Sequence, residues 1–415
     1  MIQSERLLDR FLRYVQIASP ANPNTEDYPS SPGQLELGRL LAAELTQMGA
    51  QDVEQDRYGL VWATIPASVS TNVPTILFNA HVDTSPEAPS DNIRPQVIRN
   101  YAGGEIRLPG SADKSISPQS SIALNDMHGH TLITTDGRTL LGGDDKAGVA
   151  AIMELAQHLI ENPHLPHGPV KVLFTCDEEI GRGAKHMNVA KAAATAAYTL
   201  DGGGECEVEN ETFSADMLEV VVTGYNIHPA IAQGKMVNAV RGLSLILAEL
   251  PRDQLTPETT SGKQGFLHPF HITGGVGEAR ANILLRDFET SKLDQYADLV
   301  QSAANSTQQY MPGLKVNIQR IQQYRNMADV LKQYPQVVDF AMMAHQQLGR
   351  KPHLGSIRGG TDGAQFSALG LPTPNLSVGQ HNIHSVLEFA SLDQMVYSVE
   401  HAIEVLRLWS QHAVS

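Results

Sequence analysis

Two adjacent glutamates, Glu178 and Glu179, lie just after the apolar run 170–174. Successive side chains of a strand point to opposite faces, so both carboxylates can serve one site only where the chain leaves the strand. Open α/β sheets place their ligand sites in such loops, at the carboxyl ends of strands. One carboxylate could bind a metal ion while the other moves protons. Taken alone, such a pair is more often two solvated surface acids, so other residues must support the sharper interpretation.

His81 and Asp83 end a second apolar stretch, which begins at residue 75. Residues two apart in a strand share a face, so both side chains point the same way. A carboxylate often holds the second nitrogen of a metal-bound histidine and thereby fixes its tautomer and orientation. The pair predicts a metal ligand, His81, with Asp83 as its orienting residue. The alternative is an ion pair at the end of a strand.

Three further residues repeat this pattern of a strand followed by an acid or a histidine. Asp144 follows two glycines at the start of a helical pattern, Asp201 follows the apolar run 197–200, and His384 follows a late strand. Asp144 could also be a helix N-cap, and one carboxylate can serve both purposes. Histidine and carboxylate ligands without cysteine suit Zn²⁺, Mn²⁺ or Co²⁺. Asp144, Glu179, Asp201 and a bridging hydroxide would balance two divalent ions, the charge state expected of a two-metal hydrolase.

The composition limits the classes of protein to consider. A length of 415 residues favours two domains, and 41% hydrophobic residues are ample for a core. The net charge of −15 argues against nucleic acid or an anionic membrane as a partner, and no apolar run is long enough to span a bilayer. Cys176 and Cys206 make neither a disulfide framework nor a thiolate zinc site, so we expect reduced thiols in a cytoplasmic protein.

The predicted elements alternate between strands and helices over most of the chain, which indicates an α/β fold. Between about 213 and 323 the order becomes βαββαβ, which predicts an inserted ferredoxin-like α+β domain. We therefore expect one domain from 1–212 and 324–415 and a second from 213–323. The polar stretch 85–137 is a long insertion of unassigned role, with a hairpin expected at Asp136–Gly137.

The motifs resemble those of the cocatalytic di-zinc metallopeptidase family that includes carboxypeptidase G and aminoacylase, and most closely its tripeptide aminopeptidases. The resemblance extends over nearly the whole chain and rests on residues 81–86, 132–137, 142–148, 177–179, 198–204, 358–365 and 374–376. It implies a zinc-exopeptidase-like catalytic domain, with a mixed sheet between helices, and a ferredoxin-like lid. It also implies two Zn²⁺ per subunit, for which Co²⁺ or Mn²⁺ could substitute.

The resemblance also assigns roles to the metal-site residues. His81 and Asp201 would bind one zinc, Glu179 and His384 the other, and Asp144 would bridge both. Asp83 would orient His81, and Glu178 would be the general base that activates a water bridging the two ions. His381, three residues before His384, could compete as a ligand.

Four residues are expected to bind substrate by the same resemblance. His228 would polarise the scissile carbonyl and Arg286 would hold the substrate carboxylate, while Arg358 and Asn375 complete the set. The alternatives are a helix-start histidine for His228 and a solvated pair of Arg286 with Asp287.

The function implied is removal of the N-terminal residue from tripeptides. The expected partner is a small peptide substrate, and neither nucleic acid nor a membrane is expected as a partner. The oligomeric state is left open, with a homodimer as one option. One alternative is a related dipeptidase, carboxypeptidase or N-acyl amino acid hydrolase. The other is a non-catalytic, metal-dependent binding protein, against which the base Glu178 argues, because binding alone needs no unliganded base.

Overall fold

The computed structural model describes residues 1–69 and 72–412 and divides into two compact units. The sheet unit consists of Met1–Asn210, Met327–Gly355 and Thr361–Ser415. The inserted unit consists of Glu211–Asn326 and Ser356–Gly360. The functional roles of the two units, catalytic domain and lid, stay predictions.

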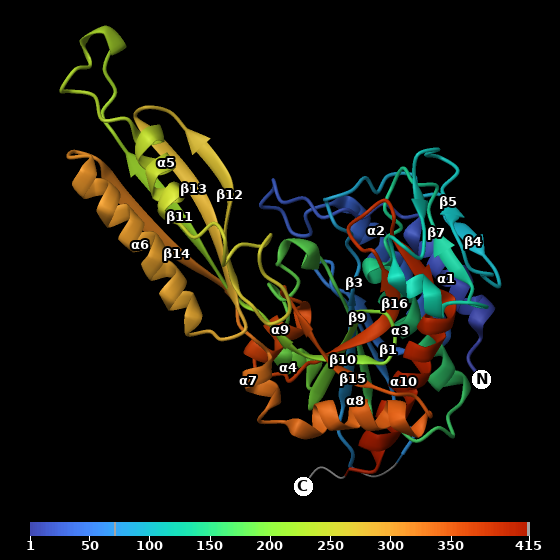
Figure 1. The fold of residues 1–415 in the computed structure, drawn as a ribbon. Helices are drawn as coiled ribbons and strands as arrows, with labels where there is room; N and C mark the ends of the chain where they lie inside the picture. Colours follow the sequence, from blue (N-terminus) through green and yellow to red (C-terminus); the bar gives the residue numbers. More distant parts are fainter. Residues whose placement is uncertain (70–71, 413–415) are drawn as a thin grey trace. The chain divides into compact units, whose positions relative to one another are not determined.

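An 11-stranded mixed sheet forms the centre of the sheet unit (Figure 1). Its strands are β1 (Gln51–Gln55), β2 (Val61–Ile65), β3 (Ile76–His81), β4 (Gln96–Ile98), β7 (Leu132–Thr134), β8 (Val170–Thr175), β9 (Ala196–Gly203), β10 (Glu207–Thr212), β15 (His353–Ile357), β16 (Asn375–His381) and β17 (Phe389–Ser391). The order is β1-β2-β8-β3-β9-β16-β17-β7-β4, and β10 pairs with β15 and β16. Strands β8, β3, β9 and β16 are mutually parallel, so their carboxyl ends share one edge.

Both faces of this sheet are covered, because strand side chains alternate between the faces. Phe78 of β3 belongs to the larger hydrophobic core, whereas its neighbour Leu77 belongs to a smaller cluster with Phe366. The helices that contribute to the larger core are α1 (Ser4–Val15), α2 (Pro32–Met48), α3 (Gly143–Glu161), α7 (Ala328–Leu331), α8 (Pro335–Gln347) and α10 (Leu392–Ser410). Those of the smaller cluster are α4 (Val189–Ala192) and α9 (Asp362–Ala368), and α9 also contributes Ala364 to the larger core. The predicted mixed sheet between helices is confirmed.

The insertion 85–137 is an ordered part of the sheet unit. It carries β4 and β7 at the end of the sheet and a separate two-stranded sheet of β5 (Ile106–Arg107) and β6 (Ser115–Ile116). The hairpin expected at Asp136–Gly137 is wrong, since β7 pairs with β4 and β17 and no strand follows the turn. Asp136 instead accepts a hydrogen bond from the backbone N–H of Arg138 (3.1 Å), which closes a local turn.

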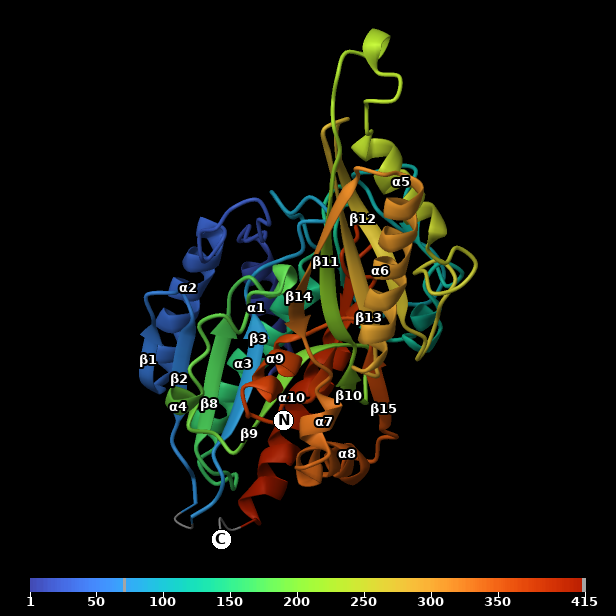
Figure 2. The same ribbon diagram turned by 90° about the vertical axis from the view of Figure 1, so that its left-hand side faces the viewer.

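The inserted unit has a four-stranded antiparallel sheet with two helices on one face (Figure 2). Its elements are β11 (Ser214–Thr223), α5 (Ala239–Glu249), β12 (Phe266–Gly274), β13 (Glu278–Asp287), α6 (Lys292–Tyr310) and β14 (Lys315–Tyr324). The spatial order β12-β13-β11-β14 and the βαββαβ chain order are those of the ferredoxin-like fold. The predicted ferredoxin-like topology is therefore present.

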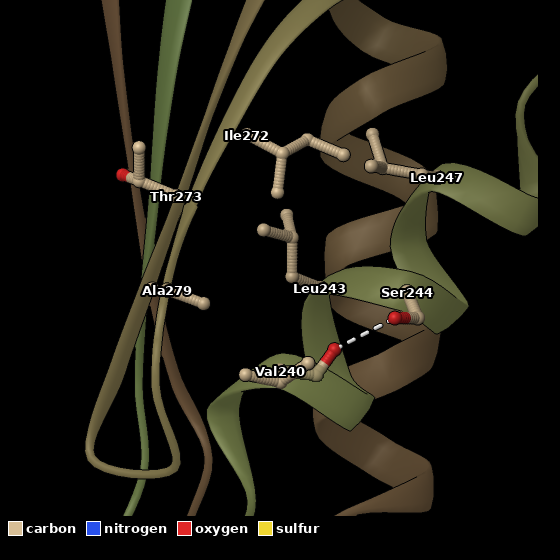
Figure 3. Close-up of a pocket in the computed structure, with 8 residues that line it drawn as sticks. Val240, Leu243, Ser244, Leu247, Ile272, Thr273 and Ala279 are labelled. Carbon is tan, nitrogen blue, oxygen red and sulfur yellow. Dashed lines mark hydrogen bonds between the residues drawn. The ribbon is translucent and has the colours of Figure 1, made fainter.

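An apolar groove of 280 Å³ lies between α5 and the edge strand β12 (Figure 3). Ile272 of β12 points towards Leu243 and Leu247 of α5, and it is 58% exposed.

None of the described helices combines the length and the apolarity that crossing a bilayer requires.

Candidate functional site

Each predicted ligand lies at or near the carboxyl-end edge of the parallel strands. His81 is the last residue of β3, Glu179 lies in a short 3₁₀ turn directly after β8, and His384 lies in the loop between β16 and β17. Asp144 is in the first turn of α3. Asp201 lies inside β9 and not after it, because the strand continues through two glycines.

Two groups of candidate ligand atoms form here and share Asp144. The groups are His81, Asp144 and Asp201, and Asp144, Glu179 and His384, with the ligand atoms of each group within 4.8 Å of one another. His81 Nε2 lies 3.0 Å from Asp144 Oδ1, and His384 Nε2 lies 3.3 Å from Asp144 Oδ2. The two oxygens of Asp144 therefore face different histidines, which is the geometry of a bridging carboxylate.

Asp83 supports this cluster through the backbone. Its Oδ1 accepts a hydrogen bond from the N–H of Glu178 (3.1 Å), and its Oδ2 accepts one from the N–H of Glu179 (3.0 Å). Its Oδ1 also lies 3.4 Å from His81 Nδ1. One buried carboxylate thus fixes the turn that carries both glutamates and lies beside the ring of His81.

The electrostatics of the cluster show an excess of buried negative charge. Burial, and then the nearby Asp144, raises the pKa of Glu179 to about 8, while burial and the same neighbour raise the pKa of Asp201 to about 6. Burial also raises the pKa of Glu178 well above its ordinary value. Burial lowers the pKa of His384, but its contacts with Asp144 and Glu179 outweigh this and raise it to about 11. Positive charge at this position is therefore strongly stabilised.

Several supporting contacts carry no signal in the sequence. Asp177 accepts hydrogen bonds from the backbone N–H of Ser30 (2.8 Å) and from Gln34 Nε2 (2.6 Å), which anchors the residue before Glu178. Gln380 Nε2 donates to Asp201 Oδ1 (3.1 Å). These partners lie 143 to 179 residues apart in the chain, so no local pattern could pair them.

His381 lies outside both groups of candidate ligands. Its Nε2 lies 2.8 Å from Gln394 Oε1, and its ring stacks on Phe389 with centroids 4.7 Å apart. The structure therefore favours His384 over His381 as the candidate ligand of this loop.

Asn375 lies beside the cluster, within the sheet unit. Its Oδ1 accepts hydrogen bonds from the hydroxyl of Thr199 (2.7 Å) and the N–H of Asp201 (3.1 Å), and its Nδ2 donates to Glu209 (2.7 Å). These contacts hold the strand that carries Asp201. A direct contact with substrate stays a prediction.

The other three predicted substrate-binding residues belong to the inserted unit. His228 is exposed, and its Nδ1 accepts a hydrogen bond from the backbone of a short 3₁₀ turn, as a helix-start histidine would. Arg286 is buried and donates to the carbonyl of Asp216 (3.1 Å), so its expected alternative, a solvated pair with Asp287, is not formed. Arg358 donates to the carbonyls of residues 262 and 264.

Comparisons with known proteins agree with this geometry. Residues 132–408 match the family described as peptidase family M20/M25/M40. Curated relatives named peptidase T are 41% identical in Geobacillus kaustophilus, over 99% of both chains, and 41% identical in Vibrio parahaemolyticus, over 97% of this chain and 98% of the relative.

Solved structures show the same fold. An aminopeptidase PepT from Bacillus cereus has a TM-score of 0.76 at 24% identity, and a tripeptidase from Staphylococcus aureus has a TM-score of 0.77 at 20% identity. Each alignment covers 99% of this chain and 100% of the other. The resemblance drawn from the motifs is confirmed, and the chain belongs to peptidase family M20/M25/M40.

Proposed function

We propose that the protein is a metal-dependent aminopeptidase that removes the N-terminal residue from tripeptides. The observation that carries this proposal is the pair of ligand groups sharing Asp144, with the half-buried Glu178 beside them but in neither group. The relatives named peptidase T and the solved structures titled aminopeptidase and tripeptidase support the substrate class.

The donor set fits two divalent cations. Each group combines one histidine nitrogen with carboxylate oxygens, which suits Zn²⁺ and also Co²⁺ or Mn²⁺. Among the described residues, Glu179 Oε1 is buried without a hydrogen-bond partner, as an oxygen reserved for a cation would be. His81 and Asp201 would hold one zinc, Glu179 and His384 the second, and Asp144 both. When bound, such ions polarise a peptide carbonyl and make an attacking water more acidic.

The chain's own residues supply the proton transfer. Glu178 follows Asp177 in a turn whose backbone is fixed by Asp83, so its carboxylate is held next to the ligands. We assign to Glu178 the role of general base, which accepts a proton from the attacking water and delivers it to the leaving amine. Asp83 keeps that turn and the ring of His81 in place.

Recognition of the peptide is assigned to the inserted unit and to Asn375. Among the described residues no carboxylate forms an ion pair with Arg286, whereas Arg320 and Arg325 pair with Asp216. A buried guanidinium without a carboxylate partner is suited to the terminal carboxylate of a peptide. His228 and Arg358 are proposed to contact the rest of the substrate as the inserted unit closes as a lid.

Hydrolysis of one tripeptide should be compared with that of its N-acetylated form and the matching dipeptide, in zinc-loaded and chelated protein. Cleavage of the free tripeptide alone, lost on chelation and restored by zinc, is expected. Cleavage of the acetylated peptide or the dipeptide instead would assign the protein to a related hydrolase. A Glu178→Gln variant should bind zinc normally but lose about 10²- to 10⁴-fold in kcat. Normal turnover in this variant would refute the assigned base.

A homodimer and a cytoplasmic location are further parts of the proposal. The edge strand β12 carries Phe270 and Ile272, 47% and 58% exposed, beside the apolar groove on α5 (Figure 3). Sedimentation should give a dimer mass that Ile272→Lys reduces to that of a monomer.

Cys176 and Cys206 are both free thiols, as expected in a reducing compartment.

A further inference from the structure

Glu388 binds the backbone of the turn that carries Asp144. Its side chain is 1% exposed, and its Oε2 accepts hydrogen bonds from the N–H groups of Leu141 (2.7 Å) and Gly142 (2.8 Å). Its Oε1 accepts a third from the N–H of Asp144 (3.0 Å). A single carboxylate therefore satisfies three backbone donors, and hydrogen bonds to a charged acceptor are the strong ones.

The local sequence permits this close approach. Asp144 and Asp145 have non-helical φ and ψ, so the backbone N–H groups of this turn lie outside regular helix and need partners from elsewhere in the chain. Gly142 has a φ of +76°, a conformation that most residues avoid. A Cβ on Gly143 would lie only 3.1 Å from Glu388 Oε1, so the glycine leaves room for the carboxylate.

The position of Glu388 in the chain links two of the candidate ligands. It lies four residues after His384, and the next residue, Phe389, is buried in a hydrophobic cluster with residues of the 85–137 insertion. That cluster is formed by Phe389 with Tyr101, Ile106, Leu108, Ile116, Leu124, Met127 and Leu132. The insertion thus holds the segment that joins the His384 loop to the Asp144 turn.

We propose that Glu388 is a positioning residue, which fixes Asp144 so that each of its oxygens faces a different ligand group. The insertion acts through it by anchoring the adjacent Phe389. This inference rests on the proposed function, because it concerns ligands of the proposed metal ions. A Glu388→Gln variant keeps the size but replaces one acceptor oxygen by an NH₂ group, which would face a backbone N–H donor.

Zinc binding should be measured by competition with a chromophoric chelator. The expected result is that Glu388→Gln weakens at least one of the two sites by about 10- to 100-fold. Glu388→Asp, which keeps the charge but is shorter, should be intermediate, and it provides a second test if the glutamine variant fails to fold. Unchanged affinity of both sites in either folded variant would overturn the inference.

Glu154→Gln is the matched control. Glu154 is also a buried carboxylate of the α3 region, but it accepts hydrogen bonds from Arg6 and Arg10 and not from the Asp144 turn. This variant should have a lower melting temperature, while its zinc affinity stays within about threefold of that of the native protein, because substitutions at separated sites act largely independently. If the native protein itself fails to bind two zinc ions, the proposed function fails, which is distinct from failure of the inference.

Discussion

Replacing Asp83 by asparagine should disable the proposed enzyme without removing any candidate ligand. In the native protein both carboxylate oxygens accept backbone hydrogen bonds, from the N–H of Glu178 (3.1 Å) and of Glu179 (3.0 Å). Asparagine has one oxygen and one NH₂ group, so it can accept from only one of these donors. The other N–H would face a second donor, and the turn would have to move.

The size of the effect follows from these two contacts. Asp83 is fully buried, so water cannot replace a lost partner without rearrangement. Losing one charge-assisted bond costs about 1.5–3 kcal/mol, and leaving a buried N–H unpaired costs about 1–3 kcal/mol. The sum, about 2.5–6 kcal/mol, corresponds to a roughly 10²- to 10⁴-fold drop in the population with both glutamates in place. We expect kcat/KM for a tripeptide to fall by a similar factor.

Asp56→Asn is the matched control for this assay. Asp56 also accepts hydrogen bonds at both oxygens, from the backbone N–H groups of Tyr58 (2.8 Å) and Leu60 (3.1 Å) at Oδ1 and from Trp62 Nε1 (3.2 Å) at Oδ2, but it lies outside the ligand groups. Both variants should lower the melting temperature, and only Asp83→Asn should lower kcat/KM of the folded, zinc-loaded protein. Native activity in a folded Asp83→Asn variant would refute the argument that the carboxylate positions the glutamate turn.

Three other perturbations give measurable outcomes. Saturating zinc should raise the melting temperature of chelated protein, because a ligand at 100 times its Kd stabilises by about 2.7 kcal/mol per site; an unchanged midpoint would contradict a preformed site. Gly148→Ala should lower the free energy of unfolding in urea by about 3 kcal/mol, because the added Cβ would lie 1.9 Å from the carbonyl oxygen of Leu200. As the control, Gly275→Ala should leave the free energy of unfolding unchanged, because no atom lies within 4 Å of its added Cβ. Burial lowers the pKa of His401 from 6.5 to about 4 and that of the stacked His345 to about 2. As the pH falls, both histidines are therefore protonated in the unfolded chain before they are protonated in the folded protein. The contribution of His401 to stability should therefore be constant above about pH 6.5 and fall by about 3 kcal/mol towards pH 4, and His401→Gln should remove that part of the slope in acid titrations of the melting temperature.

The sequence was sufficient to predict which strands carry the candidate ligands. The apolar runs before His81, Glu178 and Asp201 are local patterns, and parallel strands bring their ends to one edge. The βαββαβ order likewise predicted the inserted sheet, since each element is defined by its own residues. Local pattern failed at Asp136–Gly137, where the side chain of Asp136 accepts a hydrogen bond from the backbone N–H of Arg138 and closes the turn in place of a second strand.

The supporting contacts could not be predicted because they join distant segments. Glu388 and Leu141 are 247 residues apart, and Gln34 and Asp177 are 143 apart. Nothing in the composition of either segment identifies its partner. Only the completed fold brings each carboxylate to its backbone donor.

Adjacent acids of the same type are expected to perform different tasks in this candidate site, and their hydrogen-bond donors distinguish the two. Asp145 accepts hydrogen bonds from the backbone N–H groups of His81 (3.2 Å) and Gly148 (3.2 Å), so both of its oxygens are engaged within the fold. In the described part of the chain, the ion-pair partners of the neighbouring Asp144 carboxylate are the two histidines His81 and His384, one at each oxygen. Asp83 resembles Asp145 in this respect, because backbone amides occupy its oxygens. A carboxylate whose oxygens accept hydrogen bonds from backbone amides has fewer lone pairs left to bind a cation. A buried carboxylate that lacks such donors needs a cation nearby to be stable in its charged form. The same distinction explains why Asp144 and not Asp145 is expected to bind metal, although the sequence presents them as equivalent.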